Sequence, residues 1–128
     1  MILSVAFMID NVTFVKQLQE LSNNRFALNT LTADAFDEFY RQLLATFHLA
    51  PSRQWYLIGT EGCHLCQLAW QMLHASNTAH DIMYLELTDS TDVVIDHLGW
   101  LIPILLTPKG LLCHPFGIMD IVQLQTKQ

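Results

Sequence analysis

Residues 55–66 read WYLIGTEGCHLC and combine three local patterns. The first four residues are an apolar run typical of a short buried strand, and the next four, Gly-Thr-Glu-Gly, favour a turn. From Cys63 to about Ala75, apolar residues recur at helical spacing. The stretch therefore predicts a strand, a turn and a helix, with two cysteines three residues apart at the start of the helix.

Strands and helices alternate after this stretch. The stretch Thr88-Asp89-Ser90-Thr91 supplies a cap for a short helix from about Asp92, Gly117 opens a final helix, and Pro108-Lys109-Gly110 predicts a tight turn between two strands. The order β-α-β-α-β-β-α predicts an α/β protein with a mixed four-stranded sheet, in which helical crossovers join parallel strands and a hairpin adds an antiparallel edge. The predicted strands are residues 55–58, 82–87, 104–107 and 111–114, and the predicted internal helices are residues 63–75 and 92–98.

The chain divides near Pro51, which ends a helical pattern and precedes an extended run. A length of 128 residues suits one domain, or one domain with an appendage. We therefore expect an N-terminal extension at residues 1–50 and a main domain at residues 51–128.

The N-terminal extension is predicted to be mostly helical. Thr32 is a suitable N-cap for its clearest helix, and a weaker helical pattern runs from Val12 to Leu21. Residues 25–31 fit a short strand, so a leading βα unit is the alternative. The apolar face most simply packs against the sheet, and if it is unpacked it offers a homodimer surface. This face consists of Phe36, Phe39, Tyr40, Leu43, Leu44 and Phe47.

Composition limits the class of partner. Hydrophobic residues make up 52% of the chain and charged residues 14%, which favours a well-filled core over disorder. The formal net charge is −6 and no Lys/Arg cluster occurs, so we expect no nucleic-acid partner. The acidic balance also disfavours an anionic membrane surface, and no apolar segment approaches the roughly 20 residues that a membrane span needs.

The N-terminus and the cysteines bear on the compartment. The apolar segment from Met1 to Ile9 has neither a basic region nor a small-residue cleavage site, so it does not fit a signal peptide. Three cysteines, two of them closely spaced, are typical of a redox or metal site in a reducing compartment and not of structural bridges. We expect a cytoplasmic protein.

Cys63 and Cys66 have the spacing that thiol–disulfide exchange needs. Cys63 is expected at a helix start, where free N–H groups and the positive end of the helix dipole favour a thiolate. Cys66 lies one turn further on the same face, within reach of a disulfide. His64 would lower the pKa of the Cys63 thiol and Glu61 would raise it, and the balance depends on their geometry.

Two alternatives stay open for these cysteines. A zinc or iron–sulfur carrier needs four ligands, and Cys63, Cys66, Cys113 and His114 are the candidates, although only the first two have metal spacing. We assign no metal ligands on this basis. The thiols can also be incidental in a redox-inactive interaction module. Cys113 is most simply a small buried residue on a strand.

Pro103 directly precedes the predicted strand at residues 104–107. A proline in this position costs no ladder hydrogen bond, so a structural explanation suffices. In a thioredoxin-like order, which the predicted order resembles, Pro103 would however lie opposite the Cys-x-x-Cys. A cis peptide there would leave the backbone of Ile102 free to pair with an extended substrate segment.

Four sequence elements stand in register along the chain: GTEGCHLC at residues 59–66, Gly99-Trp100, Ile102-Pro103 and Pro115-Phe116. Together they resemble the small glutaredoxin-like family of bacteria. The match covers about residues 55–125 and leaves residues 1–50 outside. The resemblance implies a thioredoxin-like fold, a redox role for Cys63 and Cys66, and a cis Pro103.

The resemblance leaves the substrate open, because most glutathione-holding residues of glutaredoxins are replaced. Cys-His-Leu-Cys stands in place of Cys-Pro-Tyr-Cys, and no basic residue lies between Arg53 and Cys63. Gly117 and Asp120 retain part of the Gly-Gly-x-Asp turn at the last helix. A helix N-terminus favours a carboxylate, whereas Asp120 opposes one. Glutathione is a possible ligand, and no cofactor is firmly expected.

These observations favour a thiol–disulfide oxidoreductase that acts on protein or glutathione disulfides. Cys63 and Cys66 are its expected catalytic residues, with His64 and Glu61 as the groups that tune the pKa. The expected substrate-binding residues are Ile102, Pro103, Gly117 and Asp120.

Overall fold

The computed structural model describes residues 2–76 and 81–128, with side chains from residue 12 onward. The apolar side chains near the N-terminus lie outside the described residues. The helices are α1 (Ile2–Asn23), α2 (Ala33–Thr46), α3 (His64–Ala75), α4 (Asp92–Leu98) and α5 (Ile118–Thr126), with the 3-10 helices η1 (Ala27–Thr30) and η2 (Leu87–Asp89). The strands are β1 (Trp55–Gly59), β2 (Ile82–Glu86), β3 (Ile104–Thr107) and β4 (Gly110–Cys113).

The strands form one mixed sheet in the order β2-β1-β3-β4. The predicted mixed four-stranded sheet and the order β-α-β-α-β-β-α are confirmed. The expected run of parallel strands is wrong in one respect. β1 is parallel to β2 but antiparallel to β3, which also forms the antiparallel hairpin with β4. The chain between β2 and β3 contains the short helix α4, which is about 10 Å long. β3 begins at the same end of the sheet at which β2 finishes, so it runs antiparallel to β1.

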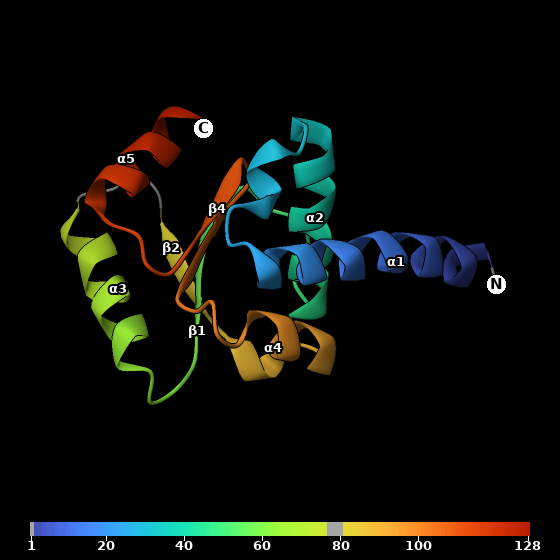
Figure 1. Ribbon diagram of the computed structural model, residues 1–128, viewed down its shortest axis with the longest axis horizontal. Coiled ribbons are helices and arrows are strands. Elements are labelled where there is room, and N and C mark those ends of the chain that lie inside the picture. The colour runs from blue at the N-terminus through green and yellow to red at the C-terminus, as the bar shows by residue number, and fades with distance from the viewer. Residues whose placement is uncertain (1, 77–80) are drawn as a thin grey trace.

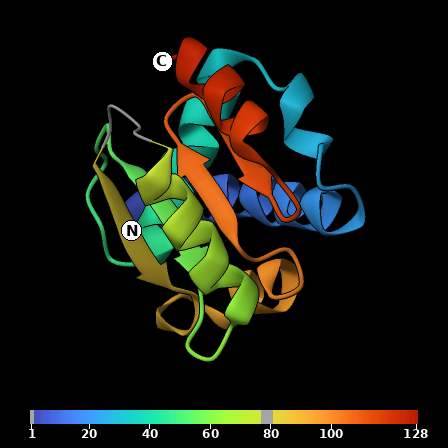
Figure 2. The ribbon, with the colours of Figure 1, turned by 90° about the vertical axis from the view of Figure 1, so that its left-hand side faces the viewer.

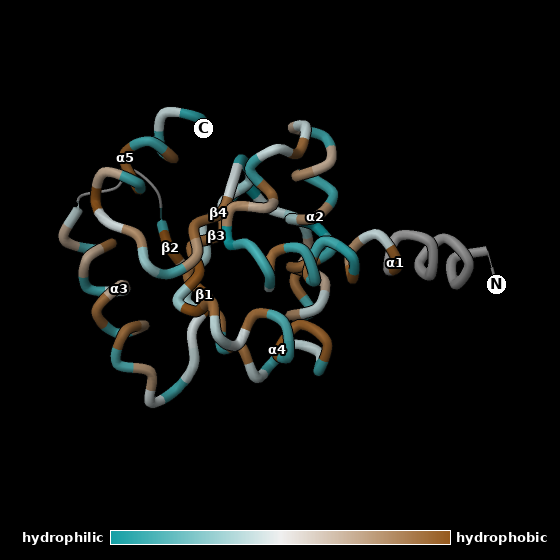
Figure 3. The backbone as a smooth tube through the Cα atoms, in the orientation of Figure 1, coloured by the Kyte–Doolittle hydropathy of each residue, from teal (hydrophilic) through white to brown (hydrophobic). Residues whose placement is uncertain are grey.

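Helices cover both faces of this sheet (Figure 1): α3 and α5 lie on one side, and α1, α2 and α4 on the other. Side chains along β1 alternate between the two layers. Trp55 and Leu57 belong to the core under α3 and α5, whereas Tyr56 and Ile58 belong to the core on the opposite face. Figure 3 shows the resulting concentration of apolar residues along β1 at the centre. All residues of β1 are buried, as expected for a strand that is covered on both sides.

The N-terminal extension supplies much of the core on the sheet face that α1, α2 and α4 cover. The aromatic side chains of α2 are buried, and the Phe39 ring packs on Phe14 of α1 with ring centroids 5.4 Å apart. The aromatic face is therefore a core contact, and the unpacked face that a homodimer through these residues requires is not present. Thr32 caps α2 as predicted, because its hydroxyl accepts the N–H of Ala35 at 3.1 Å.

The strand predicted at residues 25–31 is wrong, since this segment contains η1. Asn24 explains the difference. Its carbonyl accepts the N–H of Ala27 at 2.8 Å and its side chain accepts the N–H of Phe26 at 3.0 Å, which closes local turns in place of a ladder. Residues 2–50 accordingly contain helices and no strand of a leading βα unit.

The helix predicted to end at Pro51 stops earlier, at Thr46. His48 has a positive φ of 62°, which turns the chain out of the helix. The N–H of His48 then donates to the Ala45 carbonyl at 3.0 Å, and the N–H of Leu49 donates to the Leu44 carbonyl at 3.1 Å.

The candidate residues lie in segments that meet at one end of the sheet. Gly59 pairs with Glu86, and Ile104 pairs with both Ile58 and Cys113. The segments after β1, after β2, before β3 and after β4 therefore share that end. Figure 2 shows the molecule from the side of α3 and α5, with both helices in front of the strands. No helix of the described chain is long and apolar enough to cross a membrane.

Candidate functional site

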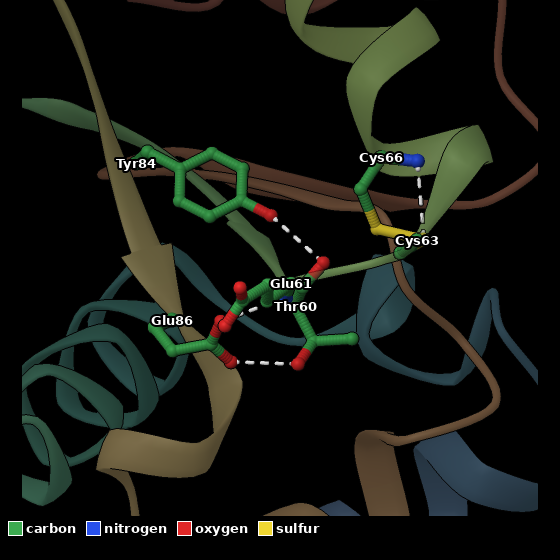
Figure 4. Close-up of a disulfide and its surroundings, with 6 residues drawn as sticks. All are labelled: Thr60, Glu61, Cys63, Cys66, Tyr84 and Glu86. Atoms are coloured by element: carbon green, nitrogen blue, oxygen red, sulfur yellow. Dashed lines mark hydrogen bonds between the residues drawn. A yellow bond between two sulfur atoms is a disulfide. The ribbon is translucent and has the colours of Figure 1, made fainter.

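Cys63 and Cys66 form a disulfide at the start of α3 (Figure 4). Their Cα atoms are 5.2 Å apart, within the usual range of roughly 4.4–6.8 Å. Cys63 is the N-cap of α3, and its Sγ accepts the backbone N–H of Cys66 at 3.1 Å. Cys66 is fully buried, whereas Cys63 is partly exposed. A molecule approaching from solvent therefore meets the sulfur of Cys63 first.

A four-residue turn leads from β1 to Cys63. The N–H of Cys63 donates to the carbonyl of Thr60 at 3.2 Å and closes the turn. Gly62, the third residue of the turn, has a φ of +80°. Type II turns require a positive φ at this position, which glycine adopts without the steric cost of a side chain.

Glu86 holds this turn from the neighbouring strand (Figure 4). Its Oε2 accepts the hydroxyl of Thr60 at 2.7 Å, and its Oε1 accepts the backbone N–H of Glu61 at 2.8 Å. Thr88 donates both its backbone N–H and its hydroxyl to Oε2, each at 3.1 Å. Glu86 was not among the predicted site residues, because only the parallel pairing of Gly59 with Glu86 brings it to the turn.

Hydrogen bonding determines the ionisation of Glu86. Burial is the largest single influence and raises the pKa of its carboxyl group. The hydrogen bonds from Thr60, Thr88 and Glu61 together outweigh burial, and the pKa of Glu86 lies below its ordinary value of 4.5. A carboxylate is therefore present beside the turn at neutral pH.

Gly59 lies where β1, β2 and the disulfide meet. A Cβ atom at this position would lie 2.9 Å from the Cβ of Cys66, 3.0 Å from its Sγ, and closer still to the hydroxyl of Tyr84. The Tyr84 hydroxyl also donates to the carbonyl of Thr60 at 3.5 Å, a long hydrogen bond. Burial, and then the charge of Glu86, raises the pKa of Tyr84, so its hydroxyl stays protonated at neutral pH.

His64 and Glu61, the residues predicted to tune the pKa, are both exposed. His64 is the first residue of α3, and its ring has no hydrogen bond within the described chain. Glu61 uses its backbone N–H to bind Glu86, and its exposed carboxylate has no partner among the described residues. Their effect on the Cys63 thiol stays a prediction.

The Ile102–Pro103 peptide bond is cis, as expected. Pro103 is buried and Ile102 is half-buried. Since Ile104 pairs with Ile58 in antiparallel register, Pro103 occupies the position beside Gly59, at the end of β1 that carries the turn. Its role in binding a substrate backbone stays a prediction.

Gly117 and Asp120 form the start of α5. The N–H of Gly117 donates to Oδ2 of Asp120 at 2.8 Å, so this carboxylate serves as a helix cap. Asp120 also lines a cavity of about 540 Å³ between η1, β4 and α5, whose lining includes neither cysteine of the disulfide nor Pro103. The structure thus does not bring Asp120 and the disulfide into one cavity. A second cis peptide, His114–Pro115, precedes this segment and was not predicted.

Cys113 is a free, buried cysteine on β4. Burial raises the pKa of its thiol to about 12, against a smaller opposing effect of Arg25. Among the residues with described side chains, no group of three or more His, Cys, Asp or Glu is placed to hold a metal ion. The four candidate ligands Cys63, Cys66, Cys113 and His114 are therefore not assembled into a site.

The site thus contains the partly exposed sulfur of Cys63, the buried sulfur of Cys66 and the carboxylate of Glu86, which binds the turn that joins β1 to the disulfide. This arrangement is chemically suited to reversible opening and closing of the disulfide. Comparisons with family models, curated proteins and solved structures give no match to this chain.

Proposed function

We propose that this chain is a thiol–disulfide oxidoreductase with a thioredoxin-like fold, similar to the small glutaredoxin-like proteins of bacteria. The observation that carries the proposal is the Cys63–Cys66 disulfide at the start of α3, with Cys63 partly exposed and Cys66 buried. The strand order β2-β1-β3-β4 and the cis Pro103 at the start of β3 support the fold assignment. Disulfides in reducing compartments are usually transient and catalytic, so a reversible Cys63–Cys66 disulfide fits a cytoplasmic location.

Cys63 is suited to be the attacking thiol. As the N-cap of α3 its sulfur accepts the N–H of Cys66, and the same donor would stabilise a thiolate in the reduced protein. The positive end of the dipole of a 12-residue helix acts in the same direction. Both effects favour the thiolate form of Cys63 in the reduced protein.

The reaction would proceed in two exchanges. The Cys63 thiolate attacks one sulfur of a substrate disulfide, which forms a mixed disulfide and releases the other substrate sulfur as a thiolate. Cys66 then loses its proton and attacks the Cys63 sulfur, which forms the Cys63–Cys66 disulfide and releases the second substrate thiolate. Two electrons have passed to the substrate, and either two glutathione molecules, which leave as oxidised glutathione, or one dithiol protein, which leaves as its disulfide, must return two electrons to regenerate the dithiol.

The charge around the site favours protein disulfides over glutathione. Residues 54–108 contain no Lys or Arg, and this stretch includes Cys63, Glu86 and Pro103. The carboxylates of glutathione would therefore find no cationic side chain from these segments, and the acidic groups Glu61 and Glu86 would repel them. A protein substrate, by contrast, can bind through its backbone and apolar side chains.

The test uses the wild type and a matched set of cysteine variants. After mild oxidation and alkylation, mass spectrometry should show a loss of about 2 Da localised to the peptide holding Cys63 and Cys66. A Cys66→Ser variant should accumulate mixed disulfides on Cys63 with a disulfide-bonded protein or with oxidised glutathione, whereas Cys63→Ser should not. Cys113→Ser is the control, because loss of a buried thiol outside the pair should leave the cycle intact.

Other outcomes would overturn the proposal. Cysteines that remain freely alkylated under all redox conditions would exclude a dithiol cycle. Stoichiometric zinc or iron in protein purified anaerobically would favour a metal carrier. Full biological activity of the Cys63→Ser variant would favour an interaction module with incidental thiols.

A further inference from the structure

We propose that Glu86 is a positioning residue for Cys63: its carboxylate fixes the turn that presents the attacking sulfur. The inference rests on the proposed thiol–disulfide function and adds a residue that lies 20 positions beyond the Cys-x-x-Cys. Glu86 does not need to touch the substrate or either sulfur. It acts through the turn formed by residues 60–63.

The contacts run in an unbroken series from β2 to the disulfide. Glu86 accepts the Thr60 hydroxyl at 2.7 Å and the Glu61 N–H at 2.8 Å, and these are the first two residues of the turn. The carbonyl of Thr60 then accepts the N–H of Cys63 at 3.2 Å, the bond that closes the turn. The Cys63 sulfur in turn accepts the N–H of Cys66 at 3.1 Å. Figure 4 shows Glu86, the turn and the disulfide in this sequence.

The carboxylate is itself held in place. Thr88, two residues after Glu86, donates two hydrogen bonds of 3.1 Å to Oε2. The Glu86 carboxylate that fixes the turn is therefore itself held by a residue near its own strand. Hydrogen bonds to an ionised acceptor are stronger than neutral ones, which makes the charged form the effective clamp. The main-chain pairing of Gly59 with Glu86 ends at this point, so the carboxylate extends the connection between the two strands beyond their last paired residues.

Two possible effects of Glu86 on Cys63 have opposite signs. As a nearby negative charge, Glu86 would disfavour the Cys63 thiolate, and its neutralisation would speed attack. As the clamp of the turn, Glu86 would keep Cys63 at the helix start and aimed at a substrate, and its neutralisation would slow attack. A pair of variants that remove the same charge, one from the clamp and one from a neighbouring site, separates the two effects.

The experiment compares Glu86→Gln with Asp89→Asn in the reduced full-length protein. Asp89 lies three residues further on, is exposed, and makes no side-chain hydrogen bond to the turn. The rate at which Cys63 attacks a small disulfide, measured from about pH 5 to 9, should fall roughly tenfold in Glu86→Gln and should not fall in Asp89→Asn. If Glu86→Gln attacks as fast as the wild type or faster, the positioning role is refuted.

A second variant guards against a folding defect. Thr60→Val keeps the charge of Glu86 and the shape of the side chain but removes the hydroxyl that binds the carboxylate. It should also slow attack, and the double variant with Glu86→Gln should be slowed by less than the product of the two single effects. Effects that multiply independently would mean that Thr60 and Glu86 do not act through one turn.

Amide hydrogen exchange separates this inference from the redox function itself. In the wild type the N–H groups of Glu61 and Cys63 should be protected, and both should exchange faster in Glu86→Gln. If the wild-type cysteines never cycle between dithiol and disulfide, the proposed function fails, but the exchange data still test the clamp. Unchanged protection of both amides in Glu86→Gln would refute the clamp whatever the redox result.

Discussion

Gly59 occupies a crowded position beside the disulfide, and Gly59→Ala tests how close the packing is. The new Cβ would lie 2.9 Å from the Cβ of Cys66 and 3.0 Å from its Sγ, and nearer still to the Tyr84 hydroxyl. Cys66 is fully buried and tied by its disulfide, so it has little freedom to move away. Overpacking of this kind costs about 1–3 kcal/mol, and we expect the upper part of that range, about 2–3 kcal/mol.

Urea unfolding of the oxidised protein measures this loss. Trp55 is fully buried on β1, four residues from Gly59, and its fluorescence should report the transition. With a slope of roughly 1–3 kcal/mol per molar urea, a loss of about 2–3 kcal/mol should lower the midpoint of Gly59→Ala by about 0.7–3 M. Because the phenol oxygen of Tyr84 is the nearest obstacle, Tyr84→Phe in the Gly59→Ala background should restore part of the loss, about 1 kcal/mol.

Gly62→Ala is the matched control at a glycine inside the turn, since Gly59 is the last residue of β1. A Cβ at Gly62 would meet no atom within 4 Å, but its φ of +80° strains any L side chain, at a cost of about 1–2 kcal/mol. Tyr84→Phe should give no rescue there. The reasoning about Gly59 is refuted if Gly59→Ala keeps the wild-type midpoint, or if Tyr84→Phe rescues both alanine variants equally.

Three further predictions follow from other parts of the structure. In the folded, reduced protein at about pH 8, iodoacetamide should label Cys63 and spare Cys113, because burial raises the pKa of Cys113 to about 12. Rapid labelling of Cys113, seen by mass spectrometry, would contradict this prediction. The pKa of Glu86 is lowered on folding, so its ionised form stabilises the protein above the ordinary value of 4.5 and this contribution disappears as the pH falls through the folded value. Glu86→Gln should accordingly flatten the acid limb of a plot of unfolding free energy against pH, and an unchanged limb would refute it. His48→Gly should raise the free energy of unfolding by about 1 kcal/mol, since His48 has a φ of 62°, whereas His48→Ala should give no gain.

Local signals predicted the elements of the main domain well. Thr91, the last residue of the predicted capping stretch, accepts the N–H of Val94 in the first turn of α4, and the hairpin between β3 and β4 forms around Pro108. Such features depend on neighbouring residues, so the sequence contains what is needed to predict them. The direction of β3, by contrast, could not be predicted from neighbouring residues. It depends on how the chain from β2 returns to the sheet, which no local pattern specifies.

The extension was harder because its structure depends on tertiary packing. Leu18 and Leu21 of the predicted helical pattern are fully buried on α1, but Phe14 joins them in the core and Val12, the first residue of the pattern, is 71% exposed. At residues 25–31 the apolar residues suggested a strand, yet the Asn24 side chain and carbonyl close turns there. Polar groups that satisfy the backbone locally can override a weak apolar pattern.

Within the candidate site, the two cysteines could be predicted from the sequence, whereas Glu86 could not. Cys63 and Cys66 are recognisable from their spacing, because both lie in one helical turn and their geometry follows from the helix itself. Glu86 could not be recognised in this way, because it reaches Thr60 and Glu61 only through the parallel register of β1 with β2. A shift of that register by one residue would turn the Glu86 side chain to the other face of the sheet. The pairing of Gly59 with Glu86 therefore does more than complete the sheet. It makes the placement of the Cys63 turn depend on a strand that contains no cysteine, so substitutions on β2 should alter thiol chemistry without touching either sulfur.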